Sequence, residues 1–261
     1  MITNILFEQL LSIIPDGQLV SVNAGVYWTA VVVKVDGKTR CGLAATISDE
    51  SYHYTNEPAV PRAGHLSELT TRDLASLVNS DHLLEVSIGL ATINALLPRL
   101  EKSWVDINAE EIIAQHGAGG KVALVGHFPF VPRLRPRVGT LWVLEQNPQE
   151  GDLPAEAASE IIPQADVLAI TAMTLLNHTY DNLIALRRPD ALTLLIGPST
   201  PLSPILFDHG VNIISGAVVD DIDSTLRGVM QGANFHQLHS MGVKLVSMSA
   251  SGRRSDGFLT S

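Results

Sequence analysis

The chain has 261 residues, of which 46% are hydrophobic and 17% charged, a balance that excludes an intrinsically disordered protein. Its formal net charge of −10 argues against nucleic acid as a partner, because phosphates require a clustered excess of Lys and Arg. No uncharged apolar run reaches the about 20 residues of a membrane span, and the start lacks the basic and small-residue features of a signal peptide. We therefore expect a cytoplasmic protein that binds neither membranes nor nucleic acid.

The first hundred residues predict a small α+β domain. Apolar residues at helical spacing predict a helix over 4–14. Two Val-rich runs, 19–35 and 39–48, are separated by Asp36-Gly37-Lys38 and predict a β-hairpin, in which Cys41 is a buried structural thiol. A polar, Pro-containing loop and two helices follow, at 49–68, 67–78 and 81–97.

The next part of the chain predicts a parallel sheet, because short apolar runs alternate with segments that suit crossover helices. The expected strands are 121–126, 140–144, 167–171, 192–196 and 211–215. The expected helices are 108–116, which bridges the two domains, and 154–162, 175–187, 203–209 and 222–232. The sequence therefore predicts an α/β protein with domains over 1–104 and 105–248, followed by a polar tail over 249–261.

Ligands of open parallel sheets bind beyond the carboxyl ends of the strands, near the point where the strand order reverses. The first expected strand ends in Gly126-His127-Phe128-Pro129, which has only the first glycine of a dinucleotide fingerprint. A pyrophosphate site of the NAD type is therefore disfavoured, although Gly126 still permits a close approach of backbone to ligand. Glu145 ends the second strand, where such folds hold a ribose diol, and a surface salt bridge is the alternative.

Polar residues also follow the third and fourth expected strands. Asn177, His178 and Thr179 are consistent with either a helix cap or contacts to a ligand. The proline-rich run after the fourth strand leaves the N–H groups of Ser199 and Thr200 free to bind an anionic group, with a rigid turn as the alternative.

His127 and His178 are the candidate catalytic residues, because imidazole transfers protons near neutral pH. Together with Glu145 they also form a set that is chemically adequate for zinc or non-haem iron. No spacing on a single element supports such a metal site. The basic run from Arg133 to Arg137 is consistent with a solvated loop or with contact to an anion or cofactor.

Three segments carry a resemblance to a known family: Gly120–Pro129, Asn177–Thr179 and Gly197–Pro204. They resemble the bacterial and archaeal family described as a putative heavy-metal chelation domain, and Gly89–Ala95 is similar to the companion domain that precedes it. The resemblance covers nearly the whole chain. It implies an enolase N-terminal-like domain followed by a Rossmann-like domain, with a site between them. It also implies that Asn94 faces the C-terminal loops, a helix C-cap being the alternative.

The leading hypothesis is a small-molecule-binding protein, an enzyme or ligand-handling protein of heavy-metal chelation or chelator metabolism. A non-catalytic protein that binds a metal or a metal chelate is the alternative from another class. A transferase that uses a nucleoside-containing cofactor is the third hypothesis, because Glu145 suits a ribose. The expected ligand is thus a divalent metal ion, a metal chelate or a nucleoside-containing molecule, and a homodimer is the default assembly.

Overall fold

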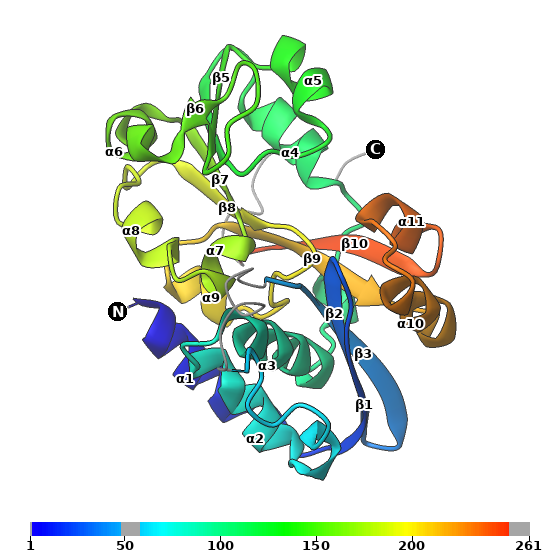
Figure 1. The fold of residues 1–261 in the computed structure, drawn as a ribbon. Coiled ribbons are helices and arrows are strands. Elements are labelled where there is room, and N and C mark those ends of the chain that lie inside the picture. The colour runs from blue at the N-terminus through cyan, green and yellow to red at the C-terminus, as the bar shows by residue number, and fades with distance from the viewer. Residues whose placement is uncertain (1, 48–57, 251–261) are drawn as a thin grey trace.

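The computed structural model describes residues 2–47 and 58–250, which form two β-sheets and the helices around them (Figure 1). The smaller sheet is antiparallel, in the order β1-β2-β3, with strands Gln18–Ala24, Trp28–Val35 and Lys38–Ala45. Residue 48 of the second predicted strand and residues 49–57 of the predicted loop lie outside the described residues, as does most of the predicted tail. No helix among the described residues is long and apolar enough to cross a membrane.

The larger sheet has seven strands in the order β10-β9-β8-β7-β4-β5-β6, and all neighbours are parallel except β10 and β9. Its strands are β4 (Lys121–Val125), β5 (Thr140–Glu145), β6 (Leu153–Pro154), β7 (Val167–Thr171), β8 (Leu192–Ile196), β9 (Ile213–Val219) and β10 (Val243–Ser249). The predicted α/β class with a parallel sheet is confirmed. The short β6 and the antiparallel β10 were not predicted.

Helices cover both faces of the large sheet, so successive residues of its strands enter different cores. Val122 and Leu124 of β4 face α4 (Ala109–His116) and α5 (Val131–Leu134). Ala123 and Val125 face the opposite core. That core also takes side chains from α6 (Ala158–Ile161), α7 (Met173–Leu176), α8 (Tyr180–Ile184) and α9 (Ile205–Asp208). Burial on both faces is the reason these strands are continuous apolar runs.

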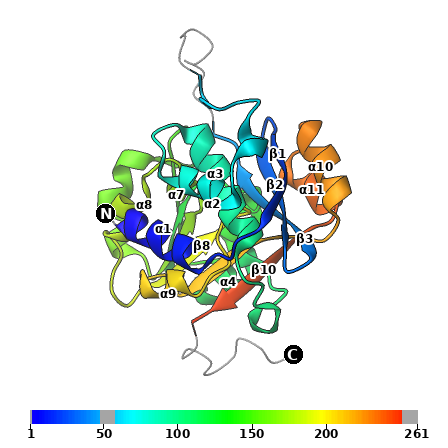
Figure 2. The ribbon, with the colours of Figure 1, turned by 90° about the horizontal axis from the view of Figure 1, so that it is seen from below.

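The N-terminal helices pack into the same core. They are α1 (Ile2–Ile13), α2 (Thr71–Ser76) and α3 (Leu83–Leu96). The view from below shows α1 and α3 in front of the large sheet (Figure 2). Asp181 of α8 accepts a hydrogen bond from the Thr3 N–H at 2.7 Å. A residue from the C-terminal part of the chain thus caps the first helix of the N-terminal part. The two parts of the chain therefore share one apolar core.

The smaller sheet is covered on both faces. Helix α3 packs on one face so closely that a Cβ on Gly42 of β3 would lie 2.2 Å from the Ala91 carbonyl oxygen. The other face meets α10 (Ile222–Met230) and α11 (Phe235–His239), where Cys41 is buried beside Leu238 as expected. The sheet is thus held between helices from the two parts of the chain (Figure 2).

Two local predictions need correction. The predicted strand over 19–35 is two strands, β1 and β2, joined by a turn in which the Gly25 N–H bonds to the Trp28 carbonyl. The predicted helix over 175–187 is interrupted between α7 and α8, where His178 has a φ of 60°. Short 3-10 helices occupy Leu66–Glu68, Leu77–Asn79, Glu101–Ser103, Arg135–Arg137, Ala155–Ala157 and Ile162–Gln164.

Candidate functional site

A cavity of about 610 Å³ lies where the order of the large sheet reverses, at the carboxyl ends of β4 and β7. From β4 the chain continues outward to β5 and β6, and it then returns to β7 on the other side. This order is that of the doubly wound dinucleotide-binding folds, which bind their ligands at this position. We call this hollow the switch-point cavity.

Both parts of the chain build the switch-point cavity. The ends of β4, β5, β7 and β8 supply most of its wall, including Gly126, Glu145, Thr171 and Ser199. The small sheet adds Trp28 and Ala45, and α11 adds Phe235. Apolar groups make up most of the lining, as is usual for small-molecule sites. The cavity thus lies between the two sheets.

Two glycines shape the floor of the cavity. Gly126 after β4 and Gly197 after β8 have φ values of 99° and 115°, a region that side chains with a Cβ rarely adopt. The chain turns sharply at each of them, and their N–H groups remain bonded to the carbonyls of Leu144 and Ser215 at 2.9 and 3.0 Å. Gly126 therefore lies at the cavity, as predicted, but its N–H is already used.

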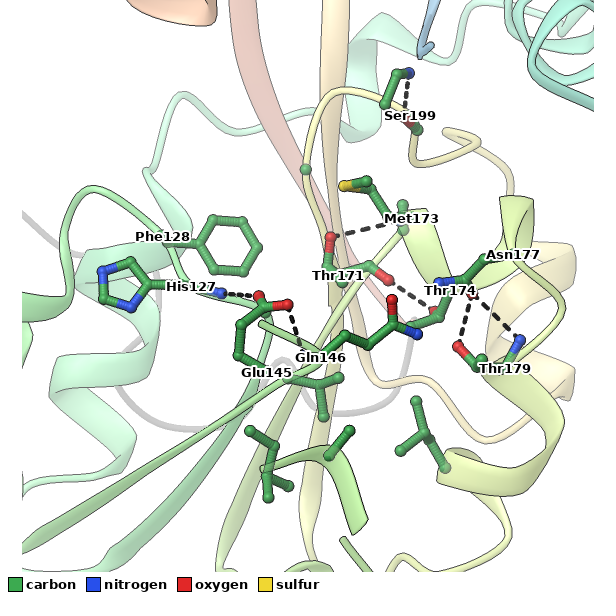
Figure 3. A pocket seen from close by; sticks show the side chains of 18 of the residues that line it. His127, Phe128, Glu145, Gln146, Thr171, Met173, Thr174, Asn177, Thr179 and Ser199 are labelled. Carbon is green, nitrogen blue, oxygen red and sulfur yellow. Dashed lines mark hydrogen bonds between the residues drawn. The ribbon is translucent and has the colours of Figure 1, made fainter. Parts of the chain in front are cut away.

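Glu145 lies at the end of β5 and lines the cavity beside Phe128 and Thr171 (Figure 3). One carboxylate oxygen accepts the His127 N–H at 2.8 Å and the other accepts the Gln146 N–H at 2.7 Å. These bonds fix the carboxylate at the edge of the cavity. Each oxygen retains a second lone pair that can accept a donor from a ligand.

His127 is among the residues that line the cavity, but its ring is bonded to a residue outside the lining. The imidazole points away from the cavity (Figure 3). Its Nδ1 lies 2.8 Å from Oδ2 of Asp152, a carboxylate that is fully buried and also accepts the Gln149 N–H. The pair joins the loop after β4 to the loop after β5. In this arrangement the ring is a structural link, and proton transfer by His127 inside the cavity is not supported.

Asn177 and Thr179 line the cavity, whereas His178 between them does not. The Asn177 side-chain oxygen accepts bonds from the Thr179 hydroxyl at 2.7 Å and from its N–H at 3.3 Å, which leaves the Asn177 NH₂ group as a donor (Figure 3). This local turn places His178 in the left-handed conformation with its side chain exposed. The prediction of His178 as a catalytic or metal-binding residue is therefore wrong for this cavity.

The loop after β8 also differs from its prediction. Ser199 lines the cavity, and its hydroxyl accepts the Ala45 N–H of β3 at 2.8 Å. Thr200 lies behind it, and its N–H is bonded to the Gly197 carbonyl at 3.0 Å, so it is not free for an anion. Asn94 does face this loop, but as a link: its NH₂ group donates to the carbonyls of Leu43 and Ser199 at 2.9 and 3.1 Å.

His127, His178 and Glu145, the expected metal-binding set, do not come together in the cavity. Within residues 2–47 and 58–250, no group of three His, Cys, Asp or Glu side chains is close enough together to hold a metal ion. The basic run does not reach the cavity either. Arg133 and Arg137 pair with Glu110 and Glu111 at 2.7 Å, and Arg135 donates to backbone carbonyls.

Several residues of the site were not predicted. Gln146 directly follows β5, and Thr171 is the last residue of β7. Both line the cavity, so the rule that ligands bind at the carboxyl ends of parallel strands applies to them as it does to Glu145. Asp152, which holds the His127 ring, was not predicted as part of the site. Trp28 and Phe235 come from elements outside the parallel strands, and no signal in the sequence connects them with the site.

The fold and the cavity define a class of protein: an α/β protein whose mostly parallel sheet reverses its strand order at a cavity that an antiparallel sheet also lines. A family model described as putative heavy-metal chelation matches residues 108–248, and a second model of the same description matches residues 7–97. The chain belongs to this family, which confirms the resemblance of its loop segments.

Solved relatives have the same fold. A protein of unknown function from Desulfitobacterium hafniense is 28% identical, with a TM-score of 0.78 over 94% of this chain and 98% of that one. A second, from Pyrococcus horikoshii, is 21% identical, with a TM-score of 0.81 over 96% and 100%. An uncharacterized protein of Methanocaldococcus jannaschii is 25% identical over 81% of this chain and 82% of its own length.

Proposed function

We propose that this protein binds a small organic molecule in the switch-point cavity and that it acts on chelators or metal chelates rather than on free metal ions. The observation that carries the proposal is the cavity itself. It has a volume of about 610 Å³, it lies at the position where this strand order binds ligands, and both parts of the chain line it.

A chelator suits the site better than a bare ion. A bare ion needs several converging ligand atoms, and the described residues include no group of three metal-ligating side chains. A chelator already supplies the ligand atoms of its metal, so the protein needs only a shaped apolar wall and a few polar contacts. Trp28, Phe128 and Phe235 provide flat apolar surfaces, and Glu145 and Asn177 provide an acceptor and a donor.

A nucleoside is the second candidate ligand, and Glu145 is the observation that favours it. Glu145 ends the second strand of a sheet with the dinucleotide-binding order, where an acidic residue accepts the two hydroxyl groups of a ribose. The loop at Gly126 lacks the glycines that would admit a pyrophosphate, so the candidate is a nucleoside without phosphates.

Titration calorimetry with three probes tests the proposal: 1,10-phenanthroline as an aromatic chelator, zinc chloride and adenosine. We expect phenanthroline to bind, alone or as its zinc complex, and zinc alone not to bind stoichiometrically. Ala155→Trp, which fills the cavity from its partly exposed rim, should abolish binding. Ala118→Trp, in an exposed turn away from the cavity, is the matched control. Stoichiometric binding of zinc alone, with no binding of phenanthroline, would favour the metal carrier instead.

A further inference from the structure

The charged groups around the switch-point cavity have one sign. Among the described residues that line it, none is Lys or Arg, whereas Glu145 and Glu156 carry carboxylates. The remaining titratable side chain is His127, whose ring is turned away and held by Asp152. The charged side chains of the lining therefore contribute only negative charge, in a chain whose net charge is also negative.

Several backbone N–H groups at the cavity already have partners within the protein. Protein sites for anions without Lys or Arg use free N–H groups that converge on the ligand. Here the N–H groups of Gly126, His127 and Gly197 are bonded to Leu144, Glu145 and Ser215. Of the two N–H groups expected to bind an anion, that of Thr200 is bonded to the Gly197 carbonyl at 3.0 Å.

Aromatic faces favour the opposite charge. Trp28 and Phe235 line the cavity with ring centroids 5.5 Å apart, and Phe128 lines it from the β4 side. The face of an aromatic ring attracts a cation, and the attraction grows when the cation is desolvated. An amine or sulfonium placed between these rings and Glu145 would thus gain from both the ring faces and the carboxylate.

We infer that the switch-point cavity selects ligands by charge: it accepts neutral and positively charged molecules with an aromatic or apolar body and rejects phosphates, sulfates and carboxylates. The inference rests on the proposed function, because it concerns the ligand of the same cavity. It narrows that function to amine-bearing or uncharged chelators and to nucleosides without phosphate. Nucleotides and polycarboxylate chelators are excluded.

Three indoles of nearly equal size test the charge rule by titration calorimetry: tryptamine, tryptophol and indole-3-acetate, which are positive, neutral and negative at neutral pH. We expect affinity to fall in that order, with indole-3-acetate at least about tenfold weaker than tryptamine, a ratio that shrinks as salt screens the carboxylates. Glu156→Gln, at the exposed rim, should reduce the ratio of the affinities for tryptamine and indole-3-acetate. Glu150→Gln, which is exposed but does not line the cavity, should leave this ratio unchanged. Glu145→Gln should narrow it further.

The outcomes separate the two proposals. Binding of indole-3-acetate as tight as that of tryptamine, abolished by Ala155→Trp, would refute the charge rule and leave the cavity as the binding site. Failure of all three indoles to bind, or binding that survives Ala155→Trp, would refute the cavity as the site and the charge rule with it.

Discussion

Asn94 connects the two parts of the chain behind the cavity, and its replacement by Ala gives a sharp test of this linkage. The side chain leaves the end of α3 and donates one hydrogen bond to Leu43 of β3 and one to Ser199 in the loop after β8. Leu43 and Ser199 are both buried, so their carbonyl groups have little access to bulk water. Truncation at position 94 therefore removes donors from two enclosed acceptors.

The cost follows from these two bonds. Removal of the donor leaves each buried acceptor without a partner, which costs about 1–3 kcal/mol per acceptor. A void of about 30 Å³ next to Asn94 and Thr200 offers a route for water to replace part of the loss. We therefore expect Asn94→Ala to lower the free energy of unfolding by about 2–4 kcal/mol.

Urea unfolding, followed by tryptophan fluorescence and by circular dichroism, measures this change. The two signals should report one transition, because residues of both parts of the chain belong to one core. Asn79→Ala, at an exposed position, is the control and should change stability by less than about 0.5 kcal/mol. A loss below about 1 kcal/mol for Asn94→Ala with an unchanged urea slope would refute the linkage.

Three other changes have defined outcomes. Gly42→Ala should cost about 3 kcal/mol or more in urea unfolding, because its Cβ would lie 2.2 Å from the Ala91 carbonyl oxygen, whereas Gly37→Asn, in an open turn, should cost less than about 1 kcal/mol. Burial raises the pKa of the Cys41 thiol to about 12, whereas the thiol of the unfolded chain has a pKa of about 8.5. The free energy of unfolding should therefore decrease as the pH rises from about 8.5 toward the folded value, because only the unfolded chain ionises there. In urea unfolding at increasing pH, Cys41→Ala should lack this decrease. His178→Ala should leave the calorimetric affinity for phenanthroline unchanged, because the side chain is exposed and outside the cavity.

The strands of the parallel sheet could be predicted because each is a short apolar run buried on both faces. Such runs at 121–126 and 192–196 match β4 and β8 within a residue. The edge strand β10 was missed because the exposed Lys244 and the polar Ser247 and Ser249 interrupt its apolar residues, so it carries no continuous apolar signal. The break at His178 was missed because it depends on a side-chain bond between Asn177 and Thr179.

The site was partly predictable for a topological reason. Glu145 and Ser199 could be placed at one sheet edge because the carboxyl ends of parallel strands meet there. The direction of a side chain at that edge is not a property of topology. His127 ends up bonded to Asp152, which lies 25 residues further along the chain, and no periodicity indicates that contact. Proximity of strand ends therefore predicts which loops meet, but not which groups face the ligand.

The position of the cavity also explains why the two parts of the chain cannot be assigned separate roles. Ser199 accepts a hydrogen bond from the Ala45 N–H, so the loop after β8 is held by the small sheet that also supplies Trp28 to the cavity. The packing of α3 against Gly42 holds that sheet in turn. A change anywhere along this series of contacts would move one wall of the cavity relative to the other. The N-terminal part is therefore a component of the cavity wall, and a molecule bound in the cavity would contact residues that neither part could bring together alone.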